Sequence, residues 1–183
     1  NGTSNTVSVY TLTNPLTTPV LTGVNIGITT YSSAPNANQL GGSTILIEGG
    51  GSGLRHEPTY RDGFLWLVHS VRNPTSASHS SIQYLKLNVT NNTVVEDFVY
   101  GAPGYWHIYS MLAVDKDHNV AITFSRSGDT EYCGAYYTTR LANDPPGFET
   151  TYLLKPGVGN YVKDFASGRN RWGDYNGVWL DPV

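Results

Sequence analysis

Apolar residues in this chain gather in short runs of two kinds. In the first kind nearly every position is apolar, and the run follows a turn that begins with aspartate, as in residues 62–70 (DGFLWLVHS) and 117–125 (DHNVAITFS). A short apolar run bounded by turn residues is typical of a strand that is buried on both faces. We therefore predict two inner strands of a β-sheet protein at these positions.

Runs of the second kind alternate apolar and polar residues. They occupy residues 7–12 (VSVYTL), 82–87 (IQYLKL) and 135–141 (AYYTTRL). Alternation with a period of two is the pattern of a strand that has one face in solvent. Turn-forming residues follow each run, and further strands are predicted at residues 93–100 and 148–154.

A third pattern also occurs twice, in residues 109–115 (YSMLAVD) and 175–181 (YNGVWLD), and predicts a strand before a turn. Taken in order, the repeat contains two apolar strands, an alternating strand and an outer strand within about 50 residues. This predicts an all-β fold, namely a β-propeller of four-stranded antiparallel blades, present as a partial ring of about three blades. The alternative is a β-sandwich or jelly roll, in which an internal repeat of this length is not expected.

The repeat divides residues 1–183 into five parts. These are the end of one blade (1–30), a loop between blades with the strand that enters the next blade (31–58), two full blades (59–104 and 105–166) and the start of another blade (167–183). Closed propellers generally have about 4 to 8 blades. We therefore expect the rest of the ring to come from a longer gene product, from further copies of this chain by self-association, or from a different chain.

The composition supports short strands and excludes several partners. Charged residues make up only 14% of the chain, whereas 20 Gly, 10 Pro and 13 Tyr are present, which suits turns and pleated strands. The net charge is −3 without a basic cluster, so we predict no nucleic-acid partner. No apolar run approaches the roughly 20 residues of a membrane span. Scarce lysine and abundant Thr, Asn and Tyr predict a secreted, extracellular protein.

Cysteine and asparagine positions add two expectations. Cys133 is the only cysteine, so the chain has no internal disulfide and no cysteine-based metal site. Sequons for N-linked glycosylation begin at Asn1, Asn88 and Asn91.

No metal and no cofactor are predicted. Asp115, Asp117 and Asp129 lack the spacing of an EF-hand loop, and the first two form a turn signature instead. The chain also contains neither a phosphate loop nor a dinucleotide fingerprint.

Catalytic candidates lie where the chain enters the first full blade. Residues 56–60 are predicted to form the innermost strand, which in a propeller faces the central channel. His56 and Glu57 could serve there as a proton donor pair, with Tyr60 beside them. The alternative is that these residues only form hydrogen bonds between blades, because no partner carboxylate or nucleophile is identifiable.

The next blade begins with an aromatic cluster that includes Tyr105 and His107. On the rim of a channel such side chains would stack on sugars and offer a polar group. The alternative is that they pack in the core between blades.

The last predicted blade begins with residues 167–175 (SGRNRWGDY), which are dense in polar and aromatic side chains. Arg169 and Arg171 could bind a carboxylate group, and Asp174 and Tyr175 complete the candidate ligand-binding set. The alternative is that Arg171 and Asp174 pair with each other and stabilise the start of the blade.

Several motifs resemble one known family. They are residues 62–66, 125–127, 135–137, 144–147 and 167–175. On these the chain resembles the secreted, mostly uncharacterised β-propeller proteins of bacteria and archaea in the sialidase-like (BNR-repeat) superfamily. The resemblance covers nearly the whole chain and implies a propeller of six or so blades in a longer protein. The aspartate turns lack the Ser-x-Asp-x-Gly-x-Thr-Trp box of true sialidases, so no catalytic residue is carried over.

These observations favour an extracellular, non-catalytic propeller module that binds glycan or protein through one face. One alternative is a sialidase-like glycoside hydrolase or polysaccharide lyase that uses His56, Glu57 and Tyr60. Another is a structural surface or filament protein that is assembled through its cut blade faces.

Overall fold

Ten β-strands make up the regular structure of this computed structural model, which describes residues 2–164 and 166–181; no helix occurs among them. The strands are β1 (Thr3–Thr13), β2 (Val20–Ser32), β3 (Thr59–Arg61), β4 (Phe64–Asn73), β5 (Ser76–Asn88), β6 (Thr93–Tyr100), β7 (Tyr105–Val114), β8 (Val120–Gly128), β9 (Glu131–Arg140) and β10 (Tyr152–Lys155). The predicted all-β fold is therefore confirmed.

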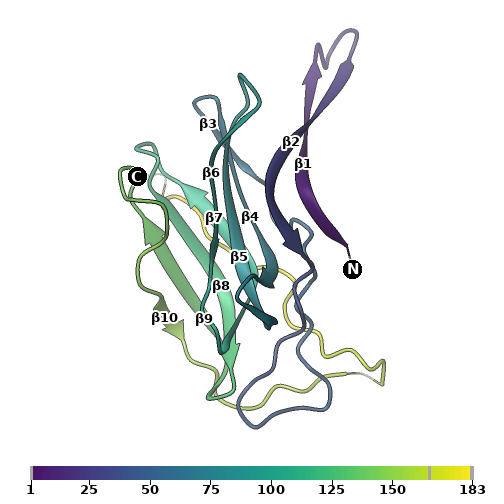
Figure 1. Ribbon diagram of the computed structural model, residues 1–183, viewed down its shortest axis with the longest axis vertical. Coiled ribbons are helices and arrows are strands. Elements are labelled where there is room, and N and C mark those ends of the chain that lie inside the picture. Colours follow the sequence, from purple (N-terminus) through teal and green to yellow (C-terminus); the bar gives the residue numbers. More distant parts are fainter. Residues whose placement is uncertain (1, 165, 182–183) are drawn as a thin grey trace.

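The strands form three antiparallel sheets, which Figure 1 shows side by side. Strands β1 and β2 form a hairpin, and the two larger sheets have the orders β3-β4-β5-β6 and β10-β9-β8-β7. Each larger sheet is a meander, because consecutive strands are hydrogen-bonded neighbours. The described residues do not close into a ring, so the structure supports antiparallel sheets of two, four and four strands, and the propeller remains a prediction.

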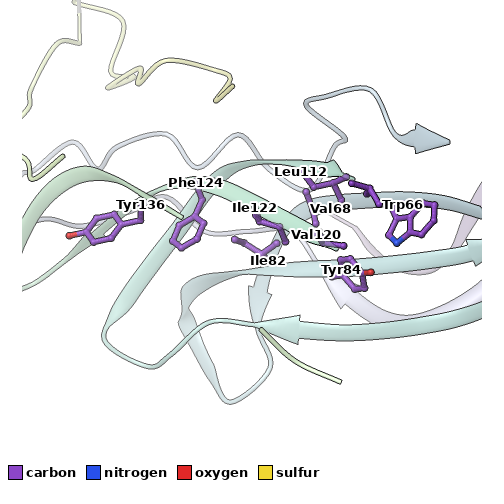
Figure 2. Packing of buried hydrophobic residues seen from close by; sticks show 10 residues of the cluster. Trp66, Val68, Ile82, Tyr84, Leu112, Val120, Ile122, Phe124 and Tyr136 are labelled. Carbon is purple, nitrogen blue, oxygen red and sulfur yellow. The ribbon is translucent and has the colours of Figure 1, made fainter. Parts of the chain in front are cut away.

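The main core lies between the two four-stranded sheets, where β7 packs against β4 and β5. Figure 2 shows Trp66, Ile82 and Tyr84 of one sheet beside Ile122 and Phe124 of the other. All five side chains are almost completely buried. Burial of each such side chain contributes roughly 1.5–3 kcal/mol, so this interface is a major source of stability.

The opposite face of the β3–β6 sheet packs against the β1–β2 hairpin. Leu67 and Leu85 lie in a second buried cluster with Ile26, and Val7 and Val9 pack against them. Strands β4 and β5 are thus buried on both faces. This double burial explains why residues 62–70 are apolar nearly throughout rather than alternating.

The far face of the β7–β10 sheet is covered by irregular chain. Ile108 and Tyr109 form a third buried cluster with Ile47 of the connection after β2, and Trp172 of the C-terminal segment packs against it. In Figure 1 both of these irregular stretches form loops at the lower end of the sheets, and the yellow C-terminal segment then passes behind the β7–β10 sheet. Part of the far face of this sheet is therefore covered as well.

The strand predicted at residues 56–60 is wrong in its extent, because β3 contains only Thr59–Arg61. Pro58 has no backbone N–H, so it cannot donate to the ladder and pairing begins after it. The outer strand predicted at residues 148–154 is likewise short, since β10 covers only Tyr152–Lys155.

Residues 175–181 form no strand, although their pattern predicts one. This stretch lies across the face of the sheet instead of pairing along its edge. Asn176 Nδ2 donates to the carbonyl of Tyr109 at 2.7 Å, and Thr123 Oγ1 donates to the carbonyl of Gly177 at 3.2 Å. The backbone N–H and C=O groups of a strand point toward its neighbours within the sheet, not toward a segment that lies over the face. Side chains therefore take part in the hydrogen bonds that hold this segment.

The buried interface predicts a large loss of stability on truncation of one ring. Trp66→Ala should lower the free energy of unfolding by about 3–5 kcal/mol, because it leaves a cavity between the sheets. Trp179→Ala is the matched control, since Trp179 is 82% exposed and its loss should change stability by less than about 0.5 kcal/mol. Urea denaturation measures both values; equal losses would contradict this account of the core.

Candidate functional site

A cavity of about 590 Å³ opens beside β7, where this strand approaches β3 and the C-terminal segment. Its walls come from three stretches that are distant in sequence: residues 55–59 with Arg61, residues 111–114 of β7, and residues 175–180 without Gly177. The residues from β7 supply an apolar floor, whereas the first stretch supplies charged groups. Cavities of about 300–1,000 Å³ with an apolar lining and few polar groups are typical of small-ligand sites.

Two exposed aromatic side chains border this cavity. Tyr175 is 70% exposed and Trp179 is 82% exposed, although large aromatic rings are usually well buried. Neither side chain has a hydrogen-bond partner among the described residues that would hold its ring against the protein. Both rings are therefore free to stack on a bound molecule.

Arg55 and Arg61 bring positive charge to the same cavity. The guanidinium of Arg55 donates to the carbonyl of Gly50. Nε of Arg61 is buried and has no hydrogen-bond partner in the described part of the chain. A guanidinium carries five N–H donors, so these side chains retain donors for hydroxyl or carboxylate oxygens of a ligand.

Tyr109 anchors the segments that form the cavity. Its backbone has φ 54°, an unusual value for a bulky residue, at an irregularity in the pairing of β7 with β8. Its hydroxyl donates to the carbonyl of Glu48 at 2.9 Å, and its own carbonyl accepts from Asn176. The bulge thus ties both covering segments to the sheet, in keeping with the tendency of such strain to cluster at functional sites.

The phenol of Tyr109 stays neutral at physiological pH. Burial, together with the nearby carboxylates of Glu48 and Asp174, raises its pKa to about 12 against the opposing effect of Arg55 and Arg171. A neutral, hydrogen-bonded phenol is a structural anchor here rather than a nucleophile.

Two of the predicted catalytic residues, His56 and Glu57, line the cavity, whereas Tyr60 does not. The ring of His56 lies against backbone carbonyls, with Nδ1 2.8 Å from the oxygen of Glu57 and Nε2 3.1 Å from that of Val68. It makes no hydrogen bond to the Glu57 carboxylate. His56 and Glu57 therefore lie at the same cavity, but their side chains do not form a hydrogen-bonded pair.

Tyr105 and His107 lie away from this cavity. The guanidinium of Arg126 sits 4.4 Å from the ring centroid of Tyr105 and covers it. His107 is only 2% exposed and packs between the sheets against Phe124. The side chain of His107 faces the core, which is the packing alternative stated for this cluster.

Burial also changes the chemistry of His107. Desolvation, together with the positive charge of Arg126, lowers its pKa to about 3. Arg126 itself forms two hydrogen bonds with Glu131, at 2.7 and 3.0 Å, and lies over the ring of Tyr136. Sequence reasoning missed this arginine because its partners lie on the neighbouring strand, and its contacts are those of a packing residue.

The structure places the candidate residues of 167–175 in different surroundings. Arg169 pairs with Glu48, and Arg171 pairs with Asp174 at 3.0 Å, which is the structural alternative stated for that pair. Tyr175 alone of these candidates lines the cavity. Trp179 and Arg61 were missed: Trp179 was assigned to a strand at residues 175–181, and Arg61 follows the strand that was predicted at residues 56–60.

The glycosylation candidates that can be placed lie at the turn after β5. Asn88 accepts a hydrogen bond from the backbone of Thr90, and Asn91 accepts one from the hydroxyl of Thr93. Asn1 lies outside the described residues.

Metal and membrane sites were also sought. Residues 2–164 and 166–181 contain no group of three His, Cys, Asp or Glu side chains that could hold a metal ion. In the same part of the chain no helix is long and apolar enough to cross a membrane.

Comparisons with protein-family models, with curated proteins and with solved structures found no match to this chain. Functional inference therefore depends on the geometry described above.

The buried histidines predict a loss of stability in mild acid. The unfolded chain binds a proton near pH 6.5, whereas native His107 does so only near pH 3, so its contribution is complete above pH 6.5 and is lost as the pH falls. At pH 5 the loss from His107 should be about 2 kcal/mol. Burial lowers the pKa of His69 as well, which adds in the same direction.

Urea denaturation at pH 7.5 and pH 5 tests this expectation. His107→Gln should flatten the pH dependence of stability, and the double variant with His69→Gln should flatten it further. An unchanged slope in both variants would contradict the role assigned to these two side chains.

Proposed function

We propose that the two four-stranded sheets are successive blades of an extracellular β-propeller. Three features support this. Both sheets are four-stranded meanders, they pack face to face, and the hairpin packs on the first sheet as the outer part of a preceding blade would. A two-sheet sandwich would leave the outer face of each sheet in solvent, whereas here the outer face of β4 and β5 is covered by the hairpin.

Within this architecture we propose that the cavity beside Tyr175 and Trp179 binds glycans without catalysis. The observation that carries the proposal is the pairing of two exposed aromatic rings with two guanidiniums around one apolar cavity. Sugar rings present C–H faces that stack on aromatic side chains and hydroxyl groups that accept from arginine. A protein ligand is less favoured, because the charged and aromatic groups converge on a hollow rather than on a flat surface.

Hydrolysis is the second candidate function, and one observation opposes it. Most glycoside hydrolases need two carboxyl groups on either side of the scissile bond. Among residues 2–164 and 166–181, the cavity lining contains one carboxylate, that of Glu57, and its histidine neighbour already faces two backbone carbonyls. The lining therefore offers binding groups without a catalytic pair.

Binding should depend on the two exposed rings. We expect Tyr175→Ala and Trp179→Ala each to weaken glycan binding at least tenfold, or about 1.4 kcal/mol, because each removes a stacking surface. Tyr60→Ala is the matched control, since Tyr60 is 66% exposed but lies outside the cavity. A glycan array followed by calorimetry on the retained sugars gives the affinities. Failure to retain any sugar, or equal weakening by Tyr60→Ala, would contradict the proposal.

A separate variant distinguishes binding from hydrolysis. Glu57→Gln removes the one carboxylate of the lining while keeping its size, so glycan affinity should change less than threefold if no bond is cleaved. Incubation of the protein with the retained oligosaccharides, followed by mass spectrometry, should show intact sugars. Cleavage that disappears in Glu57→Gln would replace the binding proposal with the hydrolase.

A further inference from the structure

One part of the cavity wall is held in place by few hydrogen bonds. Residues 50–57, the entry segment, lead toward β3 and bring Arg55 and Glu57 to the cavity. Gly50 and Gly51 within it lie in the left-handed region, with φ of 74° and 67°. Glycine gives the backbone much conformational freedom, so the position of this segment depends on its contacts. Within the described part of the chain, imidazole rings make the only hydrogen bonds that join the entry segment to other residues.

Both of these rings lie against the same part of β4. Nε2 of His56 is 3.1 Å from the carbonyl oxygen of Val68. His69 belongs to β4 itself, and its Nδ1 is 2.9 Å from the carbonyl oxygen of Ser52. The pairing of β4 with β3 extends only to Trp66. The two rings therefore hold the entry segment beyond the point at which the ladder between β3 and β4 ends.

The ring of His56 faces more acceptors than a neutral imidazole can serve. Its Nδ1 lies 2.8 Å from the carbonyl oxygen of Glu57, while its Nε2 faces Val68. A carbonyl oxygen can only accept a hydrogen bond. A neutral imidazole has one N–H and an imidazolium has two, so only the protonated ring of His56 can donate to both carbonyls at once.

His69 has similar partners but different surroundings. Its Nε2 is 3.1 Å from the side-chain oxygen of Gln83, whose amide nitrogen donates to Asp97. His69 is only 5% exposed, and burial lowers its pKa, which keeps its ring neutral. His56 is half-buried, so water can reach its ring and stabilise a charge there. Of the two rings, His56 is therefore the one that can take up a second proton.

Charges of both signs surround His56. The facing residues 111–114 of β7 contain no titratable side chain. The titratable and charged side chains that share the cavity with His56, or lie beside it on β4, are Arg55, Glu57, Arg61, His69 and Tyr175. Protonation of His56 thus adds a hydrogen bond to a wall that already carries both signs of charge.

We propose that His56 is a positioning residue of the cavity: when its ring takes up a proton, the entry segment is fixed to β4 and the cavity binds glycan more tightly. This inference rests on the proposed glycan-binding function. A wall that is already ordered loses less conformational entropy when a ligand binds. His56 acts through the position of Arg55 and its neighbours and needs no contact with the ligand. Because coupling is reciprocal, bound glycan in turn favours the protonated ring.

The ring state of His56 can be measured without a ligand. In nitrogen-15 NMR spectra of the full chain, both ring nitrogens of His56 should carry hydrogen at pH 5.5 and only one at pH 8, the range in which histidine ordinarily changes charge. Amides of the entry segment should be better protected from hydrogen exchange at pH 5.5, after correction for the intrinsic exchange rate. The same ring state, or the same protection, at both pH values would overturn the proposal.

Glycan affinity tests the consequence for binding. Affinity for the sugars that the array retains should be about threefold higher at pH 5.5 than at pH 8, which is the effect of one added hydrogen bond. His56→Gln cannot gain a proton and should remove this difference. His79→Gln is the matched control and should keep it, because the half-buried ring of His79 contacts only the hydroxyls of Ser76 and Ser78 in its own turn through Nδ1.

The proposal and the glycan-binding function fail in different ways. If no sugar binds at either pH, the glycan function is wrong, whereas the ring state and the exchange protection still show whether His56 fixes the entry segment. Glycan affinity that is equal at both pH values would overturn the role of His56. A pH dependence that persists in His56→Gln, or that disappears in His79→Gln, would overturn it as well.

Discussion

Face-to-face packing of the two four-stranded sheets is the interaction on which the rest of the structure depends. Trp66 and Tyr84 on one side and Phe124 on the other fill the space between the sheets. A sheet with apolar side chains on both faces must be covered on both. The first sheet meets this requirement with the hairpin, and the second meets it with irregular chain that carries Ile47 and Trp172.

The proposed site follows from the way in which the second sheet is covered. Residues 175–181 cross the sheet face instead of adding a strand, and they leave a hollow beside residues 55–61. Tyr109 holds the arrangement, because its bulged backbone and its hydroxyl bind the two covering segments. Tyr175 and Trp179 are then left in solvent at the rim. The cavity thus results from the way in which the C-terminal segment covers the sheet.

Local pattern predicted several of the strands, but it missed β2 (Val20–Ser32) and did not predict the contacts of the covering segments. The alternating pattern correctly predicted strands at residues 7–12 and 82–87. Residues 62–70 could be recognised as a strand because burial on both faces makes this run almost entirely apolar. The same reasoning assigned residues 175–181 to a strand, because their pattern matches 109–115. Whether such a segment joins a sheet edge or lies over its face depends on tertiary contacts, which periodicity does not contain.

The candidate site was predicted only in part for the same reason. Tyr175 was identified from the density of polar and aromatic residues around it, and it lines the cavity. His107 has an equally suggestive side chain, yet it faces the core. Successive residues of a strand point to opposite faces, so the sequence does not show which of them points inward. Trp179 was hidden by its apolar context, although exposure makes it the most accessible of the four tryptophans.

The indole N–H signals of the four tryptophans in a nitrogen-15 NMR spectrum give the most direct test of the central claim. Addition of a bound oligosaccharide should shift the signal of Trp179 and leave those of Trp66 and Trp106 unchanged, since both of these rings are buried in the cores. A sugar that binds without moving the Trp179 signal would contradict the account.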